Sequence, residues 1–270
     1  MTFSWPLPVA LLTTAALSAV GFAAVAQTGD EPARVYLIGN SLTWDTIPPR
    51  LDGGDDGRVQ FHVFCNRNLR FIHNRPNDHC VEESTPWPQA LAEPSYDFLS
   101  IQPFAGTTLA EDTGLIADWA KAQPDATLVL HTSWTKLAAF PEAYASTDAA
   151  PDSPMQPSPA YFDALVARLQ KELPGREIRT TNCHDLLDAV HQDIEAGRGP
   201  FKSLADLGRD EIHMNFGPGR YLTHNAMRRA LNQSPTDEGF ELKPDVKAYL
   251  DAKLAAHGWT APADVPTPAE

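Results

Sequence analysis

Five short runs of mostly apolar residues recur along the chain, and each predicts a β-strand. The first run, RVYLI, leads into Gly39, and a glycine directly after an apolar run is typical of a tight turn. The second run alternates in VQFHVF, and the last, EIRTT, carries the weakest signal. The predicted strands are 34–38, 59–64, 96–101, 126–131 and 177–181.

Between the strands, apolar residues recur at about every 3.6 positions, which predicts amphipathic helices. The stretch 158–173 places large apolar residues on one face, namely Tyr161, Leu165, Leu169 and Leu173. Similar patterns predict helices at 108–122, 185–196 and 220–231. Alternating strands and helices predict an α/β fold with a mainly parallel five-stranded sheet and helices on both faces. Sites in such sheets form at the carboxyl ends of the strands.

The two ends of the chain differ in composition from the rest. Residues 9–26 carry no charge and end in Ala24-Val25-Ala26, which predicts a cleaved signal peptide at 1–26 and a secreted or periplasmic protein. No Lys or Arg stands in 1–8, so an uncleaved membrane anchor is the alternative. The Pro- and Ala-rich segment 261–270 predicts a disordered tail, which leaves 27–260 as one domain.

The net charge of the chain argues against one class of partner, nucleic acid. The formal net charge is −14, and nucleic-acid binding needs a basic face. We therefore expect no nucleic-acid partner and, after signal cleavage, no stable membrane insertion. The oligomeric state is not indicated by the sequence.

Three cysteines are compatible with an exported protein. Cys65 and Cys80 flank a short segment and predict a disulfide. The alternative is a metal site formed by both cysteines with His73 and His79, but their spacing matches none of the usual zinc templates. The third, Cys183, predicts a small buried thiol.

Two short motifs carry candidate chemistry. In Gly39-Asn40-Ser41-Leu42, the serine follows the first predicted strand, and Asp210-Glu211-Ile212-His213 stands before the helix predicted at 220–231. A serine hydroxyl becomes a good nucleophile when an imidazole takes its proton and a carboxylate orients that imidazole. Each motif alone is weak, because such serines usually cap turns and such pairs are usually solvated.

Together and in this order, the two motifs resemble those of the SGNH (GDSL-like) hydrolase superfamily. The resemblance covers roughly 35–231 and implies a three-layer α/β/α sandwich around a five-stranded parallel sheet, similar to flavodoxin-like folds. It also implies that Ser41 is the nucleophile, His213 the general base and Asp210 the residue that orients the histidine. No cofactor or metal is implied.

The middle motifs depart from the family pattern. Family members stabilise the oxyanion with a glycine N–H after the second strand and an asparagine side chain after the third. Here Asn66 follows the second strand and Gln102 the third. The predicted oxyanion donors are therefore the Gln102 side chain and the backbone N–H groups of Asn66 and Ser41. Losing one such donor costs roughly 10²–10³ in rate.

Four further residues are candidates for substrate binding. Trp44 and Trp134 could stack on a sugar ring, His131 could line the pocket, and Arg67 could bind an acidic group. Core packing or a solvated loop is the alternative for each. We therefore expect an exported serine esterase that acts on a carbohydrate ester or another small acyl ester. The alternatives are a non-catalytic carbohydrate-binding protein and an acyltransferase that uses the same triad.

Overall fold

The computed structural model describes residues 31–93 and 95–260. The predicted signal peptide at 1–26 and the predicted tail at 261–270 lie outside these residues. Within the described ranges, no helix is both long enough and apolar enough to cross a membrane.

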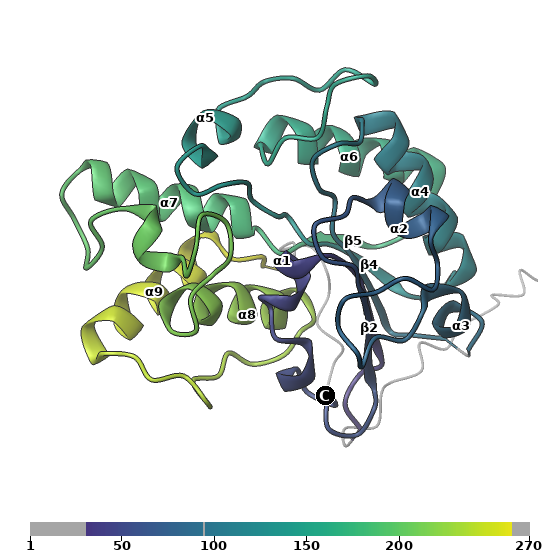
Figure 1. Ribbon diagram of the computed structural model, residues 1–270, viewed down its shortest axis with the longest axis horizontal. Coiled ribbons are helices and arrows are strands. Elements are labelled where there is room, and N and C mark those ends of the chain that lie inside the picture. The colour runs from purple at the N-terminus through teal and green to yellow at the C-terminus, as the bar shows by residue number, and fades with distance from the viewer. Residues whose placement is uncertain (1–30, 94, 261–270) are drawn as a thin grey trace, which may run out of the picture.

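Parallel strands form a central sheet in the order β2-β1-β3-β4-β5 (Figure 1). Each strand lies within the range predicted for it or one residue beyond, so the predicted α/β fold with a five-stranded sheet is confirmed, and every pairing is parallel. The strands are β1 (Val35–Gly39), β2 (Val59–Val63), β3 (Phe98–Ile101), β4 (Thr127–Leu130) and β5 (Ile178–Thr180).

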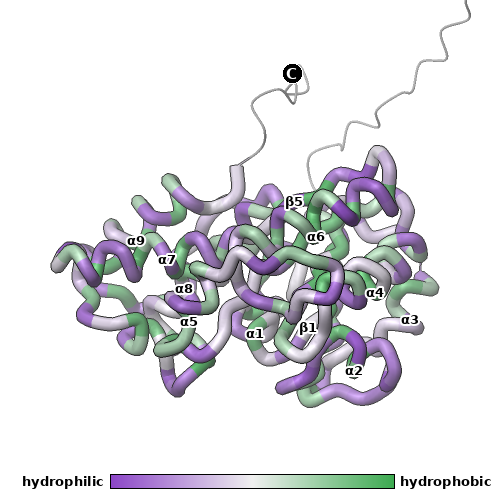
Figure 2. Tube along the Cα trace, turned by 90° about the horizontal axis from the view of Figure 1, so that it is seen from above, coloured by the Kyte–Doolittle hydropathy of each residue, from purple (hydrophilic) through white to green (hydrophobic). Residues whose placement is uncertain are grey.

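Helices cover both faces of the sheet because alternate strand residues point to opposite sides. Tyr36 and Ile38 share an apolar cluster with α2 (Leu69–Asn74), α3 (Trp87–Leu91), α4 (Leu109–Ala122) and α6 (Pro159–Glu172). Val35 and Leu37 pack instead with Met227 of α8 (Pro218–Ala230). A further cluster joins α8 to α5 (Phe140–Tyr144), α7 (Cys183–Glu195) and α9 (Pro244–His257). Figure 2 shows hydrophobic and hydrophilic positions interspersed along the helices, as expected of helices with one face on the sheet.

The four predicted helices correspond to α4, α6, α7 and α8. Thr108 and Glu111 form a capping box that begins α4, which explains why this helix starts where the polar loop ends. The sequence patterns did not predict α9, whose buried residues are Leu250 and Leu254 alone. The short helices α1 (Ser41–Trp44), α2, α3 and α5 also escaped prediction, since four to six residues are too few to show a helical period.

The cysteines lie as predicted. Cys65 and Cys80 form a disulfide across 15 positions of sequence. Their sulfur atoms bond to each other, so neither is a thiolate ligand, and the described residues contain no cluster of three or more metal-ligating side chains. Cys183 is buried, and burial raises the pKa of its thiol to about 12, which keeps it protonated at neutral pH.

The strand order changes direction once, between β1 and β3. From β1 the chain crosses to β2 on one side, and then returns past β1 to form β3 on the other. In open α/β sheets, the carboxyl ends of two such strands border the crevice in which ligands bind. Ser41 follows β1 and Gln102 follows β3, so both stand at this crevice.

Candidate active site

Ser41 begins the short helix α1 at the carboxyl end of β1. The preceding Asn40 caps this helix, since its Oδ1 accepts a hydrogen bond from the Leu42 N–H at 2.9 Å. A Cβ on Gly39 would lie 2.0 Å from Oγ1 of Thr43, so only glycine lets the turn fold back this tightly. The result is a half-buried Ser41 at the crevice.

The hydroxyl of Ser41 contacts His213, which is 172 positions away in the sequence. Oγ of Ser41 lies 2.9 Å from Nε2 of His213, and Nδ1 of the same ring lies 2.8 Å from Oδ2 of Asp210. One tautomer satisfies both contacts. With the ring proton on Nδ1 donated to Asp210, Nε2 accepts from the serine hydroxyl, which is the arrangement that a general base requires.

Backbone N–H groups hold the Asp210 carboxylate in its charged form. Its Oδ1 accepts from the N–H of His213 at 2.7 Å and from that of Ile212 at 2.9 Å. These bonds, chiefly the one from His213, hold the pKa of Asp210 well below its usual range. The neighbouring Glu211 points away, with its side chain 76% exposed and paired to Lys136 at 2.6 Å.

The loop that carries Asp210 and His213 is bound to the segment after β4. Nε1 of Trp134 donates to the Ile212 carbonyl at 2.6 Å, and the Leu137 N–H donates to the Glu211 carbonyl at 2.8 Å. These bonds hold the two residues between Asp210 and His213 in place.

Asp45 is a residue of this region that the sequence analysis missed. It directly follows α1 and its carboxylate is fully buried, with Arg209 and Arg220 as ion-pair partners. Two arginines flanking the D-x-x-H motif in an acidic chain were the signal available in the sequence.

Gln102 lies beside the turn of Ser41 and directs its side-chain oxygen, not its nitrogen, toward that turn. Oε1 accepts from the N–H of Asn40 at 3.0 Å, and from the N–H and the hydroxyl of Thr43 at 3.0 and 2.8 Å. Nε2 is buried and has no hydrogen-bond partner among the described residues. The donor that the predicted oxyanion role needs is therefore enclosed by protein rather than presented to the crevice.

Two backbone donors remain available for an oxyanion. The N–H groups of Ser41 and Asn66 make no hydrogen bond within the part of the chain that the structure describes. Asn66 follows β2 and has a left-handed φ of 55°. Nδ2 of Asn40 donates to the Arg67 carbonyl at 3.1 Å, which ties the turn of Asn66 to that of Ser41.

Two of the predicted substrate-binding residues are buried. Trp134 is 1% exposed, and its Nε1 donates to the Ile212 carbonyl. His131 is 0% exposed, and its Nδ1 lies 3.0 Å from Oγ1 of Thr181. Burial lowers the pKa of His131 to about 4, so it is neutral. Trp44 is half-buried and packs on Phe61, with ring centroids 5.4 Å apart. The structure thus gives Trp134 and His131 packing roles rather than a surface that a substrate can reach.

Arg67 is exposed and has no carboxylate within 4.0 Å among the described residues. Its guanidinium lies 4.6 Å from the ring centre of Phe71. Phe71 and Phe216, 38% and 69% exposed, are the large exposed apolar residues of the described chain. Phe216 stands three positions after His213, and sequence patterns offered no signal for it.

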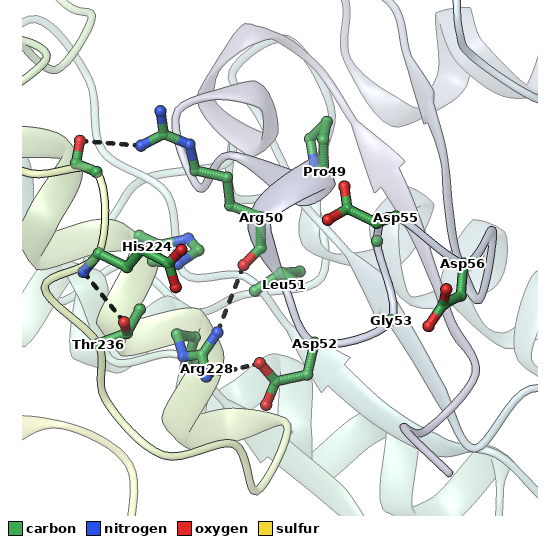
Figure 3. Close-up of a pocket in the computed structure, with 13 residues that line it drawn as sticks. Pro49, Arg50, Leu51, Asp52, Gly53, Asp55, Asp56, His224, Arg228 and Thr236 are labelled. Carbon is green, nitrogen blue, oxygen red and sulfur yellow. Dashed lines mark hydrogen bonds and ion pairs between the residues drawn. The ribbon is translucent and has the colours of Figure 1, made fainter.

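A separate cavity of about 430 Å³ lies at the amino end of the sheet, before β2 (Figure 3). Its walls include Arg50, Asp52, His224 and Arg228, and Arg228 contacts Asp52 at 2.8 Å. Nδ1 of His224 donates to the Thr46 carbonyl at 2.7 Å, and the ring is buried. None of the residues in the serine–histidine–aspartate arrangement lines this cavity.

Comparisons with known proteins give distant similarities of fold. No family model matches this chain, and no curated protein sequence matches it. Among solved structures, a DUF4886 family protein from Bacteroides uniformis ATCC 8492 is 18% identical with a TM-score of 0.39, covering 84% of this chain and 95% of its own. A protein described as a "putative GDSL-like lipase" from Parabacteroides merdae ATCC 43184 is 13% identical with a TM-score of 0.41, covering 75% and 97%. At these low values no activity carries over, and what the chain shares with them is at most a GDSL-like fold.

Proposed function

We propose that this protein is a serine esterase with Ser41 as nucleophile, His213 as general base and Asp210 as the residue that orients the histidine. The observation that carries the proposal is the continuous path from Oγ of Ser41 to Nε2 of His213 at 2.9 Å, and from Nδ1 to Oδ2 of Asp210 at 2.8 Å. The imidazole and the carboxylate belong to one loop, but the serine hydroxyl comes from 172 positions away, and random surface placement does not align it with them.

The reaction follows from these positions. Oγ of Ser41 attacks the ester carbonyl carbon while Nε2 of His213 takes the hydroxyl proton. The carbonyl oxygen becomes an oxyanion, which the backbone N–H groups of Ser41 and Asn66 stabilise. The C–O bond to the alcohol then breaks as His213 returns the proton to the leaving oxygen. Water repeats the sequence on the acyl-enzyme, which releases the acid and restores the serine.

In this proposal Gln102 orders the nucleophile turn instead of donating to the oxyanion. Its carbonyl oxygen accepts three hydrogen bonds from the residues on either side of Ser41, Asn40 and Thr43. A turn held in this way keeps the N–H of Ser41 in a constant direction before substrate arrives, which is the preorganisation that oxyanion stabilisation needs.

The substrate we propose is an ester of a carbohydrate or another small acyl ester outside the cytoplasm. Export is supported by Ala24-Val25-Ala26 and by the Cys65–Cys80 disulfide, because disulfides persist mainly in oxidising compartments. N-terminal sequencing of protein recovered outside the cytoplasm should begin at Gln27. The exposed ring of Phe216 supports a sugar substrate because an aromatic face stacks on a sugar ring, and the exposed Arg67 suits an acidic group on that substrate.

Covalent labelling tests the proposal. A fluorophosphonate reacts with an activated serine hydroxyl, so wild-type protein should be labelled and hydrolyse p-nitrophenyl acetate and acetylated oligosaccharides, and Ser41→Ala should do neither. A folded wild type that binds acetylated glycans without being labelled would overturn the esterase and favour a binding protein. Acyl transfer to an added sugar in place of release to water would favour an acyltransferase.

A further inference from the structure

We propose that Asp45 is a positioning residue of this site, which holds the loop of His213 against the turn of Ser41. The inference rests on the proposed function and adds to it a residue outside the three that react. It assigns a role to a fully buried carboxylate that the chemistry itself does not use.

Each oxygen of the Asp45 carboxylate is directed to a group near the histidine loop. Oδ1 lies 2.7 Å from Nη1 of Arg209 and 2.9 Å from Nη2 of Arg220. Oδ2 accepts from the N–H of Met214 at 2.8 Å. Arg209 directly precedes Asp210, and Met214 directly follows His213. The carboxylate therefore bonds to the residue before the D-x-x-H motif and to the residue after it.

The other end of this connection is the nucleophile. Asp45 directly follows α1, and its N–H donates to the Ser41 carbonyl at 3.0 Å. A single residue thus joins the backbone of the serine to the segment that carries the base. Any shift of the carboxylate changes the separation between Oγ of Ser41 and Nε2 of His213.

The arginines close the connection. Nη1 of Arg209 also donates to the Met214 carbonyl. Met214 is therefore bonded to Asp45 through its N–H and to Arg209 through its carbonyl. Both guanidinium groups lie over the ring of Phe216, at 5.5 Å for Arg209 and 4.7 Å for Arg220.

General stability does not account for this carboxylate. Burying a charge is costly, and buried ion pairs often stabilise a fold no more than apolar side chains of the same volume. The packing of α1 on α8 has other bonds, since Oγ1 of Thr223 donates to the Asp45 backbone carbonyl at 3.0 Å and His224 contacts the Thr46 carbonyl. The side chain of Asp45 adds an ion pair to Arg220 of α8 and, through Arg209 and the N–H of Met214, its contact with the histidine loop.

Asp45→Asn tests the role in the full-length protein. The amide has the same size but no charge, so it removes the ion pairs with Arg209 and Arg220. A displacement of about 1 Å between reacting groups can cost on the order of 10² in rate. We expect kcat for an aryl ester and the rate of fluorophosphonate labelling to fall about 10- to 100-fold, with KM within about twofold.

Asp52→Asn is the matched control. Asp52 also pairs with an arginine of α8, Arg228 at 2.8 Å, but it borders the remote cavity and does not contact the histidine loop (Figure 3). It should leave kcat unchanged. Equal losses in both variants, or an unchanged kcat in folded Asp45→Asn, would overturn the inference. If Asp45→Asn does not fold, Arg209→Gln, at a partly exposed position, should show the same loss in kcat.

A crystal structure of the variant separates this inference from the proposed function. In Asp45→Asn, Nε2 of His213 should move out of hydrogen-bond reach of Oγ of Ser41, and in Asp52→Asn it should remain. This readout holds even if wild-type protein hydrolyses no ester, which would overturn the proposed function alone. An undisturbed contact in Asp45→Asn would overturn the positioning role alone.

Discussion

The N–H of Met214 donates to Oδ2 of Asp45 at 2.8 Å, which joins the residue after His213 to the residue after the helix of Ser41. Through this bond the loop of His213 and the turn of Ser41 are both joined to Asp45. The distance of 2.9 Å between Oγ of Ser41 and Nε2 of His213 is therefore a property of the folded crevice rather than of either motif.

The proposed function predicts that removing Ser41 or His213 abolishes hydrolysis. We expect Ser41→Ala and His213→Ala each to lower kcat by roughly 10⁴-fold or more, and the double variant to be little worse, because the two residues act as one unit. Steady-state kinetics with an aryl ester measures this. Ser234→Ala and His257→Ala, at exposed positions, are the matched controls and should keep full activity. Losses that multiply in the double variant would contradict a shared step.

Two substitutions at Gln102 separate its oxygen from its nitrogen. Gln102→Glu keeps an acceptor for the N–H groups of Asn40 and Thr43 but removes the amide donor, whereas Gln102→Leu removes both. We expect Gln102→Glu to retain kcat within about tenfold, and Gln102→Leu to lose roughly 10² because the turn of Ser41 loosens. Equal losses of about 10²–10³ in both would return Gln102 to the oxyanion role.

The disulfide should stabilise the fold measurably. In the chain-entropy model, closing a loop of about 15 residues contributes about 3 kcal/mol to the free energy of unfolding. Urea denaturation of Cys65→Ser/Cys80→Ser should show a loss of that order, and the reductant dithiothreitol should have no further effect on the variant. Mass spectrometry of non-reduced protein should recover Cys65 joined to Cys80, with Cys183 alkylated only after unfolding because it is buried.

Asp112 should make a contribution to the free energy of unfolding that falls as the pH rises. Burial raises its pKa to about 7, and its Oδ2 accepts from the Tyr161 hydroxyl at 2.7 Å. Between about pH 4 and 7 the folded chain holds a proton at Asp112 that the unfolded chain has released, so this group's contribution to stability falls as pH rises. It is fully present below about pH 4 and lost above about pH 7.

Asp112→Asn removes this dependence and keeps the acceptor for Tyr161. The free energy of unfolding is measured with urea at pH 4 and at pH 8 for both proteins. From pH 4 to pH 8, the variant should gain on the order of 3 kcal/mol relative to the wild type. Asp118→Asn, an exposed position on the same helix, is the control and should follow the wild type. A wild type and an Asp112→Asn variant with parallel pH profiles would contradict the raised pKa.

Much of the architecture followed from local patterns. Four strands were predictable as short apolar runs, which is how buried parallel strands read, the polar β5 gave a weaker signal, and four of the longer helices showed their period. The helix α9 was not predictable because few of its side chains are buried. Short helices such as α1 depend on a cap, here Asn40, and on partners elsewhere in the chain.

The sequence by itself determined the candidates: a serine directly after an apolar strand and a glycine, and an aspartate and histidine three apart in one loop. Such relations depend on neighbours along the chain, so they are visible in it. The tertiary structure decided which way Gln102 turns its amide and that Trp134 and His131 are buried. It alone decided the contacts of Asp45, whose partners Arg209, Met214 and Arg220 stand 164 to 175 positions away. No local pattern encodes a contact over such a distance, because it exists only when the parallel sheet brings the end of β1 to the loop before α8.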